Sequence, residues 1–425
     1  MSDRLRRRPR TVRTVAPAAA SALAAAPVAV IAITSTYLSV LTVAAWTAFR
    51  RGDRTTPPTS HRSSEASTSF TILVPAHDEE LLVAETVDRL MALDYPRHLF
   101  DVHVVADHCG DLTVEVARDH GALVLENADP DVRGKGPALR WAFDHLDSKA
   151  AIRDVVVFVD ADTSADNGLL RAFDRRFAGG AVATQAYYAV RDPAATPAVA
   201  MRAAALAVRH YLRPLARCHL GGTCGLFGNG MGFRADVYRS RQMSGHLTED
   251  LELQLELVLG DDVIEFVPEA VVEAEMPSTA AAARTQNERW ESGRIDLTRR
   301  YVPRLVRSAL GRRARRRLTK LDTAVDLVLP PFSVLVAATA ASTAIAVGGA
   351  GSGRLGRIIA GVAIANVVAQ AFHVLSALRM VRAPAAVYRA LASAPGVVAW
   401  KVALWVRALS GRTDSDWIRT ARNPE

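Results

Sequence analysis

Two acidic residues follow a short apolar run in the middle of the chain. Residues 155–159 are all apolar, which is typical of a strand covered on both faces, and they lead into Asp160-Ala161-Asp162. Side chains alternate along an extended chain, so Asp160 and Asp162 point the same way. Paired carboxylates suit Mg²⁺ or Mn²⁺, and such a metal can neutralise a departing diphosphate. A solvated turn is the alternative, but the position after a buried strand favours a metal site.

A second acidic pair, Glu249 and Asp250, follows Thr248 at the start of a segment with helical periodicity. Thr248 can cap that helix, and both acids suit its first turn, which explains them without any catalysis. Alternatively, one of the acids lies in a cleft and takes the proton from an acceptor hydroxyl as a general base. The residues by themselves leave both interpretations open.

A third motif is Gln286-Asn287-Glu288-Arg289-Trp290. The spacing i, i+3, i+4 places Gln286, Arg289 and Trp290 on one helix face. An arginine can hold a diphosphate there, and an indole ring can stack on a sugar. A buried tryptophan beside a surface arginine is the alternative.

Polar loops also follow earlier strands. The loop after the first strand contains Pro75, Ala76, His77, Asp78 and Glu79, and the second strand ends at Asp107. A basic loop, residues 133–137, opens a helix with Lys135 and suits a phosphate. Its spacing differs from that of a P-loop, which argues against an ATPase. Ordinary loops, caps and a surface turn are the alternatives for these segments.

The elements that must position these residues alternate in type. Short apolar strands at 70–74, 102–106 and 155–159 alternate with helical patterns at 81–93, 113–119 and 137–146. This alternation predicts an open α/β sheet, mostly parallel, which binds ligands at the carboxyl ends of its strands.

Other segments are apolar enough to enter a membrane. Residues 14–49 contain no charged side chain, which predicts a transmembrane helix; a cleaved signal peptide is the alternative. Residues 324–347 and 358–378 predict a helical hairpin. Residues 385–409 are interrupted by Arg389, Lys401 and Arg407, which favours a helix lying at the interface over one that spans.

The net charge is +8, and the excess is concentrated before an apolar block. Eight lysines and arginines lie between Arg304 and Lys320 without an acid among them. Nucleic acid is a possible partner for such a run, but its position beside a membrane segment favours anionic lipid headgroups and predicts no nucleic-acid partner. The three cysteines form no C-x-x-C pair, which indicates a reducing compartment for the soluble part.

Taken in order, these motifs resemble the family 2 glycosyltransferases with a GT-A fold, and especially the membrane branch of cellulose, chitin and hyaluronan synthases. The resemblance covers residues 70–290. It implies a Rossmann-like, mixed and mostly parallel sheet with helices on both faces, accompanied by transmembrane and interfacial helices. It also implies an inverting transfer from a nucleotide sugar, expected to be a UDP-sugar, with Mg²⁺ or Mn²⁺ as cofactor.

The same resemblance implies roles for individual residues. The loop from Pro75 to Glu79 would bind the donor, Asp107 the uracil and Lys135 the nucleotide. Asp160 and Asp162 would hold the UDP and its metal, and Asp250 would be the general base. The residues implied on the acceptor and diphosphate side are Glu249, Gln286, Arg289 and Trp290.

We therefore expect four regions. They are a tail and transmembrane helix at 1–50, a linker at 51–69, a GT-A domain at 70–300, and a membrane-associated region at 301–425. Because nucleotide sugars are cytosolic, the expected protein is a multi-pass protein of the cell membrane with a cytoplasmic catalytic domain. The six arginines within the first thirteen residues would then lie outside, against the usual charge bias.

The leading prediction is transfer to a saccharide hydroxyl in envelope or extracellular polysaccharide synthesis. One alternative is a single transfer to a lipid or polyprenyl-phosphate acceptor. A second is a non-enzymatic basic scaffold or nucleic-acid-binding membrane protein.

Overall fold

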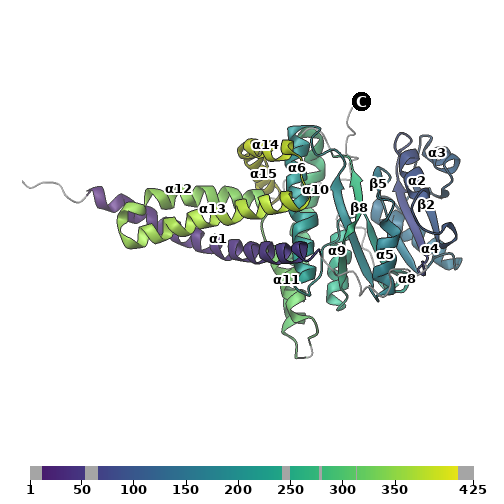
Figure 1. Ribbon diagram of the computed structural model, residues 1–425, viewed down its shortest axis with the longest axis horizontal. Coiled ribbons are helices and arrows are strands. Elements are labelled where there is room, and N and C mark those ends of the chain that lie inside the picture. The colour runs from purple at the N-terminus through teal and green to yellow at the C-terminus, as the bar shows by residue number, and fades with distance from the viewer. Residues whose placement is uncertain (1–11, 53–65, 242–248, 277–279, 313, 410–425) are drawn as a thin grey trace, which may run out of the picture.

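A computed structural model describes residues 12–52, 66–241, 249–276, 280–312 and 314–409. Figure 1 shows an α/β domain at one end and a long bundle of helices at the other. Several further helices lie across the junction between these two parts.

The α/β domain is built on one sheet of eight strands in the order β3-β2-β1-β4-β7-β6-β8-β5. The strands are β1 (Phe70–Ala76), β2 (Phe100–Asp107), β3 (Leu123–Asn127), β4 (Val155–Phe158), β5 (Thr163–Ala165), β6 (Ala183–Val190), β7 (Met231–Arg234) and β8 (Ile264–Ala274). β1 to β4 pair in parallel, β7 is antiparallel to both of its neighbours, and β5 is antiparallel to β8. The prediction of a mixed, mostly parallel sheet is confirmed, and the three predicted strands coincide with β1, β2 and β4.

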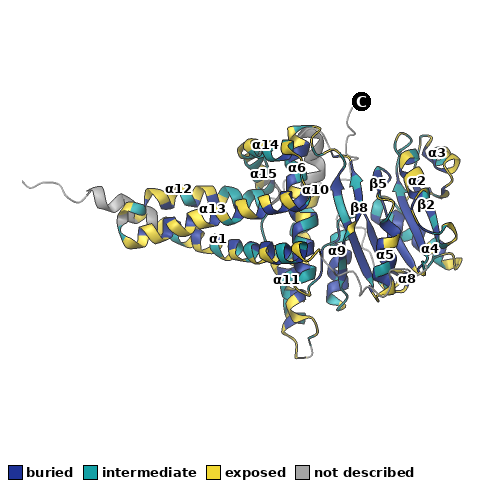
Figure 2. Ribbon diagram, in the orientation of Figure 1, coloured by how far each residue is buried: buried dark blue, intermediate teal, exposed yellow. Residues whose placement is uncertain are grey.

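Helices cover both faces of this sheet. They are α2 (Val83–Met91), α3 (Thr113–Asp119), α4 (Lys135–Ser148), α5 (Leu169–Ala178), α8 (Ala235–Arg239) and α9 (Glu249–Leu259). α2 and α5 bury apolar side chains against one face of the sheet, and α4 packs into a separate core on the other face. The strands between these layers are buried, as Figure 2 shows. The sheet is therefore covered on both sides, which leaves its strand ends as the place where the charged residues of the predicted site can meet.

The bundle consists of α1 (Val12–Arg50), α12 (Phe332–Gly348) and α13 (Arg354–Met380), which pack on one another. Within the described residues, 22–50 and 354–380 are long and apolar enough to cross a membrane. Polar side chains are paired inside the bundle: Gln370 donates to Thr339 over 2.8 Å, and the Thr42 hydroxyl lies 2.7 Å from Nδ1 of His373. Apolar side chains cover much of the outside, which suits contact with lipid.

The predicted helix over 324–347 is wrong as a single element. The structure ends α11 (Arg317–Val328) before Pro330 and Pro331, and α12 begins at Phe332 after a bend of 69°. Proline lacks the N–H that a continuous helix requires, and its ring restricts the preceding residue. Counted together, α11 and α12 form a possible third, broken span.

Residues 385–409, predicted to lie at the interface, form α14 (Ala385–Ala390), a short turn and α15 (Ala394–Leu409). They are not among the candidate spans of the described chain. α14 packs against α6 (Pro197–Leu206), and α15 packs against α10 (Ala280–Leu310) and α12. This segment therefore lies at the junction between the bundle and the α/β domain (Figure 1).

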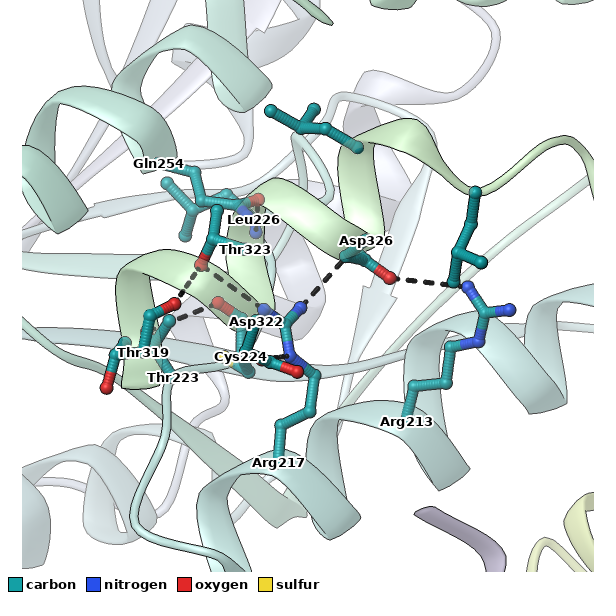
Figure 3. Close-up of polar contacts among 12 residues, drawn as sticks. Arg213, Arg217, Thr223, Cys224, Leu226, Gln254, Thr319, Asp322, Thr323 and Asp326 are labelled. Atoms are coloured by element: carbon teal, nitrogen blue, oxygen red, sulfur yellow. Dashed lines mark hydrogen bonds and ion pairs between the residues drawn. The ribbon is translucent and has the colours of Figure 1, made fainter. Parts of the chain in front are cut away.

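An ion cluster connects the two parts of the molecule. Arg217, in α7 (Arg213–His219), is 4% exposed, and its guanidinium lies 2.6 Å from the Asp322 carboxylate and 3.4 Å from that of Asp326 (Figure 3). Arg213 also pairs with Asp326, at 3.4 Å. Asp322 in turn accepts a hydrogen bond of 2.9 Å from the hydroxyl of Tyr37 in α1. One carboxylate thus contacts both the bundle and a helix of the α/β domain.

Candidate functional site

The acids after β4 are held in place by a buried asparagine. The backbone N–H of Asp160 donates to Oδ1 of Asn229 over 3.2 Å, and Nδ2 of Asn229 donates to the hydroxyl of Thr163 over 2.8 Å. Asn229 is fully buried. It therefore fixes both ends of the turn that carries Asp160 and Asp162.

Lys135, the first residue of α4, reaches this turn from the other side. Its ammonium donates to the Asp160 carboxylate and, over 2.7 Å, to the backbone carbonyl of Gly228. Gly228 has φ of +80°, and a Cβ there would lie 3.5 Å from Oδ2 of Asp250 and 3.6 Å from Nζ of Lys135. The positive φ favours glycine at this position, and both the lysine ammonium and the Asp250 carboxylate lie beside it. This brings Asp160, Lys135 and Asp250 into one site.

Glu249 belongs to the same site. A Cβ on Gly136 would lie 3.1 Å from the Glu249 side chain, so the start of α4 meets the start of α9 there. Burial and the negative charge of Asp250 together raise the pKa of Glu249 to about 7, against the opposing effect of Lys135. This acid changes charge near neutral pH.

Asp160 and Asp250, the two aspartates of this site, also have raised pKa values. Burial raises the pKa of Asp160. The negative charges of Asp162 and Asp250 raise that pKa as well, whereas the positive charge of Lys135 lowers it. Burial raises the pKa of Asp250 as well, while Lys135 and Arg209 oppose the rise. The site therefore holds more negative charge than its nearest cation neutralises, and a divalent metal or a second cationic group would stabilise it.

Asp107 is more enclosed than a surface ligand of a nucleobase would be. It is 7% exposed, and it accepts hydrogen bonds from Nδ2 of Asn127 (2.8 Å) and the N–H of Gly134 (3.0 Å). Nδ1 of His108 lies 2.8 Å from the same carboxylate. Gly134 has φ of +93°, which favours glycine, and it immediately precedes Lys135. Asp107 therefore holds the loop that aims the lysine.

The loop after β1 packs against the loop after β2. Pro75 and Ala76 still belong to β1, and Nδ1 of His77 lies 2.6 Å from the backbone oxygen of Asp107. The N–H of Glu79 donates to the Thr113 hydroxyl over 2.7 Å. These contacts place the predicted donor loop at the carboxyl edge of the sheet.

Asp78 lies in the same loop and has φ of +54°, and its Oδ1 accepts from the N–H of Gly110 over 2.8 Å. It lines a cleft of 410 Å³ together with Glu80, Leu81, Gly110 and Asp111. Ligand atoms of Asp78, Cys109 and Asp111 lie within 4.8 Å of one another. Asp111 caps the start of α3 and accepts from the N–H of Glu80, so turn geometry accounts for this cluster.

The third sequence motif lies on α10, which places residues 286, 289 and 290 on the helix at the junction with the bundle. The side chains of Gln286 and Arg289, like Thr248, are outside the described residues. Trp290 is 36% exposed, and the Arg202 guanidinium lies 5.4 Å from the centre of its ring. The structure therefore gives the position of this motif from the backbone of α10 and from the side chain of Trp290.

Several residues of the site were missed from the sequence. Gln185 is fully buried; it donates to the backbone oxygen of Asn229 over 2.8 Å and accepts from the N–H of Phe227 over 3.0 Å. Burial raises the pKa of the Tyr188 hydroxyl, and the negative charges of Asp160 and Asp162 raise it as well. The Gly-rich stretch 225–230 was a usable signal for Asn229, but Gln185 and Tyr188 carry none.

Comparison with known proteins places this geometry in context. Residues 67–293, just over half of the chain, match the family model described as "Glycosyltransferase like family 2". The chain is similar to a β-monoglucosyldiacylglycerol synthase of Trichormus variabilis, with 25% identity over 253 residues, 57% of this chain and 52% of that protein. It is also similar to the low-salt glycan biosynthesis hexosyltransferase Agl6 of Haloferax volcanii, with 29% identity over 24% of this chain and 23% of that one. The chain spans about half the length of the first relative.

Among solved structures, the mannosyltransferase PcManGT of Pyrobaculum calidifontis, in complex with GDP-Man and Mn²⁺, aligns with a TM-score of 0.49 and 20% identity. The alignment covers 83% of this chain and 99% of that one. The glucosyl-3-phosphoglycerate synthase of Mycobacterium tuberculosis, with Mn²⁺, UDP-glucose and phosphoglyceric acid, aligns with a TM-score of 0.39 and 21% identity, over 53% of this chain and 78% of that one.

Proposed function

Because this chain belongs to glycosyltransferase family 2, we propose that it transfers a sugar from a nucleotide sugar to an acceptor hydroxyl at a membrane, with inversion. The preferred donor is a UDP-sugar. The observation that carries the proposal is the gathering of Asp160, Glu249 and Asp250 around Lys135, beside the backbone of Gly228. Such a site can hold a diphosphate on one side and a base on the other.

The donor set fits a divalent metal. Asp160 and Asp162 follow a buried strand, and the raised pKa of Asp160 reflects burial beside other acids that Lys135 only partly offsets. Oxygen ligands in excess of local positive charge suit Mg²⁺ or Mn²⁺. In the proposal these two aspartates hold the metal, which when bound neutralises charge on the departing diphosphate. Lys135 remains close enough to bind a phosphate oxygen.

Asp250 is the proposed general base. As the acceptor oxygen forms its bond to the anomeric carbon, Asp250 accepts the hydroxyl proton. The bond from that carbon to the diphosphate oxygen breaks, and the nucleotide diphosphate leaves with the electron pair. Attack from the face opposite the leaving group inverts the configuration without a covalent enzyme intermediate. Glu249, with a pKa of about 7, lies next to Asp250, and its charge influences the proton affinity of Asp250.

The remaining predicted residues take supporting roles in the proposal. The loop from Pro75 to Glu79 and the Asp107 carboxylate shape the nucleoside side, since both lie at the carboxyl edge of β1 and β2. Gln286, Arg289 and Trp290, which α10 carries, are the proposed contacts to the diphosphate and the acceptor. The domain boundaries of 70–300 and 301–425 are proposed to separate this catalytic unit from the membrane-associated region.

The acceptor is either a saccharide or a lipid. A saccharide acceptor, in envelope or extracellular polysaccharide synthesis, is supported by the motif resemblance to cellulose, chitin and hyaluronan synthases. A lipid or polyprenyl-phosphate acceptor is supported by the similarity to a protein named as a glucosyldiacylglycerol synthase and by the candidate membrane helices. The protein is proposed to be a multi-pass protein of the cell membrane whose catalytic domain faces the cytoplasm.

One assay tests the donor, and product sizing tests the acceptor. Purified full-length protein in lipid nanodiscs is supplied with Mn²⁺ or Mg²⁺ and a panel of UDP- and GDP-sugars, and release of the nucleotide diphosphate is measured. We expect release from a UDP-sugar, and loss of that release in Asp250→Asn. No release from any donor, or equal release by the variant, would refute the proposal. A polymeric product indicates a saccharide acceptor, and a single glycolipid indicates the alternative.

A further inference from the structure

The hairpin of α10 and α11 carries most of the chain's excess positive charge, and the structure divides that charge into two groups. Arg304 lies 3.1 Å from Glu256, and Lys320 lies 2.8 Å from Asp261, so both pair with acids of the α/β domain. Lys320 is only 2% exposed. These cations are used in holding the hairpin to the domain.

The arginines near the tip of the hairpin form a separate, exposed group. In the described part of the chain no acid forms an ion pair with any of them: Arg307, Arg312, Arg315 and Arg316. Arg317 instead closes the turn by donating to the backbone oxygens of Gly311 (3.0 Å) and Arg312 (3.3 Å). The tip therefore presents positive charge that the protein itself does not neutralise.

Beside these arginines, α11 has an exposed apolar face. Leu318 is 81% exposed, Val325 45% and Val328 61%, and Leu310 at the end of α10 is 73% exposed. Leu318 and Val325 are seven residues apart, about two helical turns, and so lie on one face. The opposite face is buried against α10 and the domain through Thr319, Thr323 and Leu327. Exposure of this apolar face to water is unfavourable, whereas a helix at a membrane surface can bury such a face in the lipid.

The contacts of α11 show the direction in which its apolar face points. Asp322 lies between Leu318 and Val325 on that face, and it accepts a hydrogen bond from Tyr37 of the candidate spanning helix α1. After Val328 the chain bends by 69° into α12, which enters the bundle. Figure 1 shows α11 lying across the end of the bundle rather than along it. The exposed apolar side chains thus face the side from which the bundle extends.

We propose that the tip of the α10–α11 hairpin is a second membrane anchor, in which Leu310, Leu318 and Val325 enter the leaflet on the catalytic side and the tip arginines bind anionic phospholipid headgroups. The occupant is a lipid surface because the face is continuous with the lipid-exposed outside of the bundle. Anionic lipid is favoured because the uncompensated charge is positive and guanidinium groups pair with phosphate. This inference does not depend on the sugar-transfer reaction.

The test uses a fluorescent reporter at position 318. Leu318→Cys is made in the full chain with Cys109→Ser and Cys218→Ser, labelled with bimane and placed in nanodiscs that contain brominated phosphatidylglycerol or brominated phosphatidylcholine at equal mole fraction. Leu123→Cys, at the exposed edge strand β3, is the matched control. We expect quenching at 318 by both lipids, at least about twofold stronger with the anionic lipid, and no quenching at 123.

A second pair of variants separates charge from insertion. Arg312→Gln with Arg315→Gln is expected to bring the ratio of quenching by the two lipids to about one, while the label at 318 stays quenched. Arg312→Lys with Arg315→Lys keeps the charge and is expected to keep most of the preference. The same quenching at 318 as at 123 would overturn the proposal, because the face would then contact water or another protein. Equal quenching by both lipids in the unsubstituted hairpin would overturn the anionic preference.

Discussion

The ammonium of Lys135 bonds to the carboxylate of Asp160, although the two residues lie on different elements, the start of α4 and the loop after β4. Glu249 and Asp250 raise the pKa of the same ammonium, against the opposing effect of its burial. The acids of the site therefore act as one charge cluster around a shared cation. A change at any one of them alters the proton affinity of the others.

Replacing Lys135 tests this charge cluster through stability. In Lys135→Met the acids lose their nearest cation, and we expect unfolding to become easier by about 2 kcal/mol. Because a divalent cation can take over the neutralisation, Mg²⁺ should raise the melting temperature of the variant more than that of the parent. Thermal unfolding in detergent with and without Mg²⁺ measures both effects. Lys149→Met, at an exposed lysine, is the control, and identical melting of all three proteins would contradict the idea.

Asp250→Asn tests the general base. The amide keeps the shape of the side chain but cannot take a proton at neutral pH, so turnover should fall by about 100-fold or more. Donor affinity, measured by titration, should change little, because the proposed donor contacts come from other residues. Asp236→Asn removes an exposed acid that pairs with Arg234, and it should leave turnover unchanged. A variant that turns over normally would exclude Asp250 as the base.

Metal removal tests the roles of Asp160 and Asp162. Chelation should abolish nucleotide release, and Mn²⁺ or Mg²⁺ should restore it. The electron spin resonance signal of free Mn²⁺ then reports binding without turnover, and Asp162→Asn should weaken binding by about tenfold or more. Asp111→Asn examines the other group of potential ligands, Asp78, Cys109 and Asp111, and should not weaken it. The reverse pattern would place the metal at that second group.

Asn229 is a positioning residue, and its removal should be costly. Asn229→Ala leaves the Asp160 N–H and the Thr163 hydroxyl without their partner in a buried place. We expect a loss of about 1–3 kcal/mol in the free energy of unfolding, measured by denaturant titration. Thr163→Ser keeps the hydroxyl and should cost less. If Asn229→Ala and Thr163→Ser unfold alike, the hydrogen bonds of Asn229 do not hold this turn.

Arg217→Ala tests the ion cluster of Figure 3. Removing a guanidinium that is 4% exposed leaves the carboxylates of Asp322 and Asp326 poorly compensated, and we expect a loss of about 3 kcal/mol or more. Arg234→Ala breaks an exposed pair and should cost about 1 kcal/mol at most. Unfolding of both variants, followed in detergent, compares them directly. Equal losses would show that burial of Arg217 adds nothing.

The sequence was sufficient to predict β1, β2 and β4 and the acids at their ends. A run of consecutive apolar residues indicates a buried strand such as β4, and the alternation of strand and helix predicts the parallel sheet. The break between α11 and α12 was also visible, because Pro330 and Pro331 interrupt the apolar block.

Other features depend on contacts that no local pattern encodes. Lys135 and Gly228 meet across 93 positions, and Arg217 and Asp322 across 105. Asp107 was predicted to bind the donor, which stays a prediction, and the structure adds a contact that holds the loop before Lys135. A sequence motif identifies such a residue without telling whether its side chain faces a ligand or the protein's own backbone.

The hydrogen bond from Tyr37 to Asp322, together with the ion pair from Asp322 to Arg217, has a geometric consequence. One carboxylate joins α1 to α7, so a tilt of α1 would pull on α7 as well and limit how far the α/β domain moves relative to the bundle. If Asp250 is the base and the acceptor is anchored in the bilayer, as in the proposed lipid alternative, the headgroup of that acceptor must be long enough to reach Asp250. Acceptors would then be selected by the length of their headgroups, before any pocket recognises their chemistry.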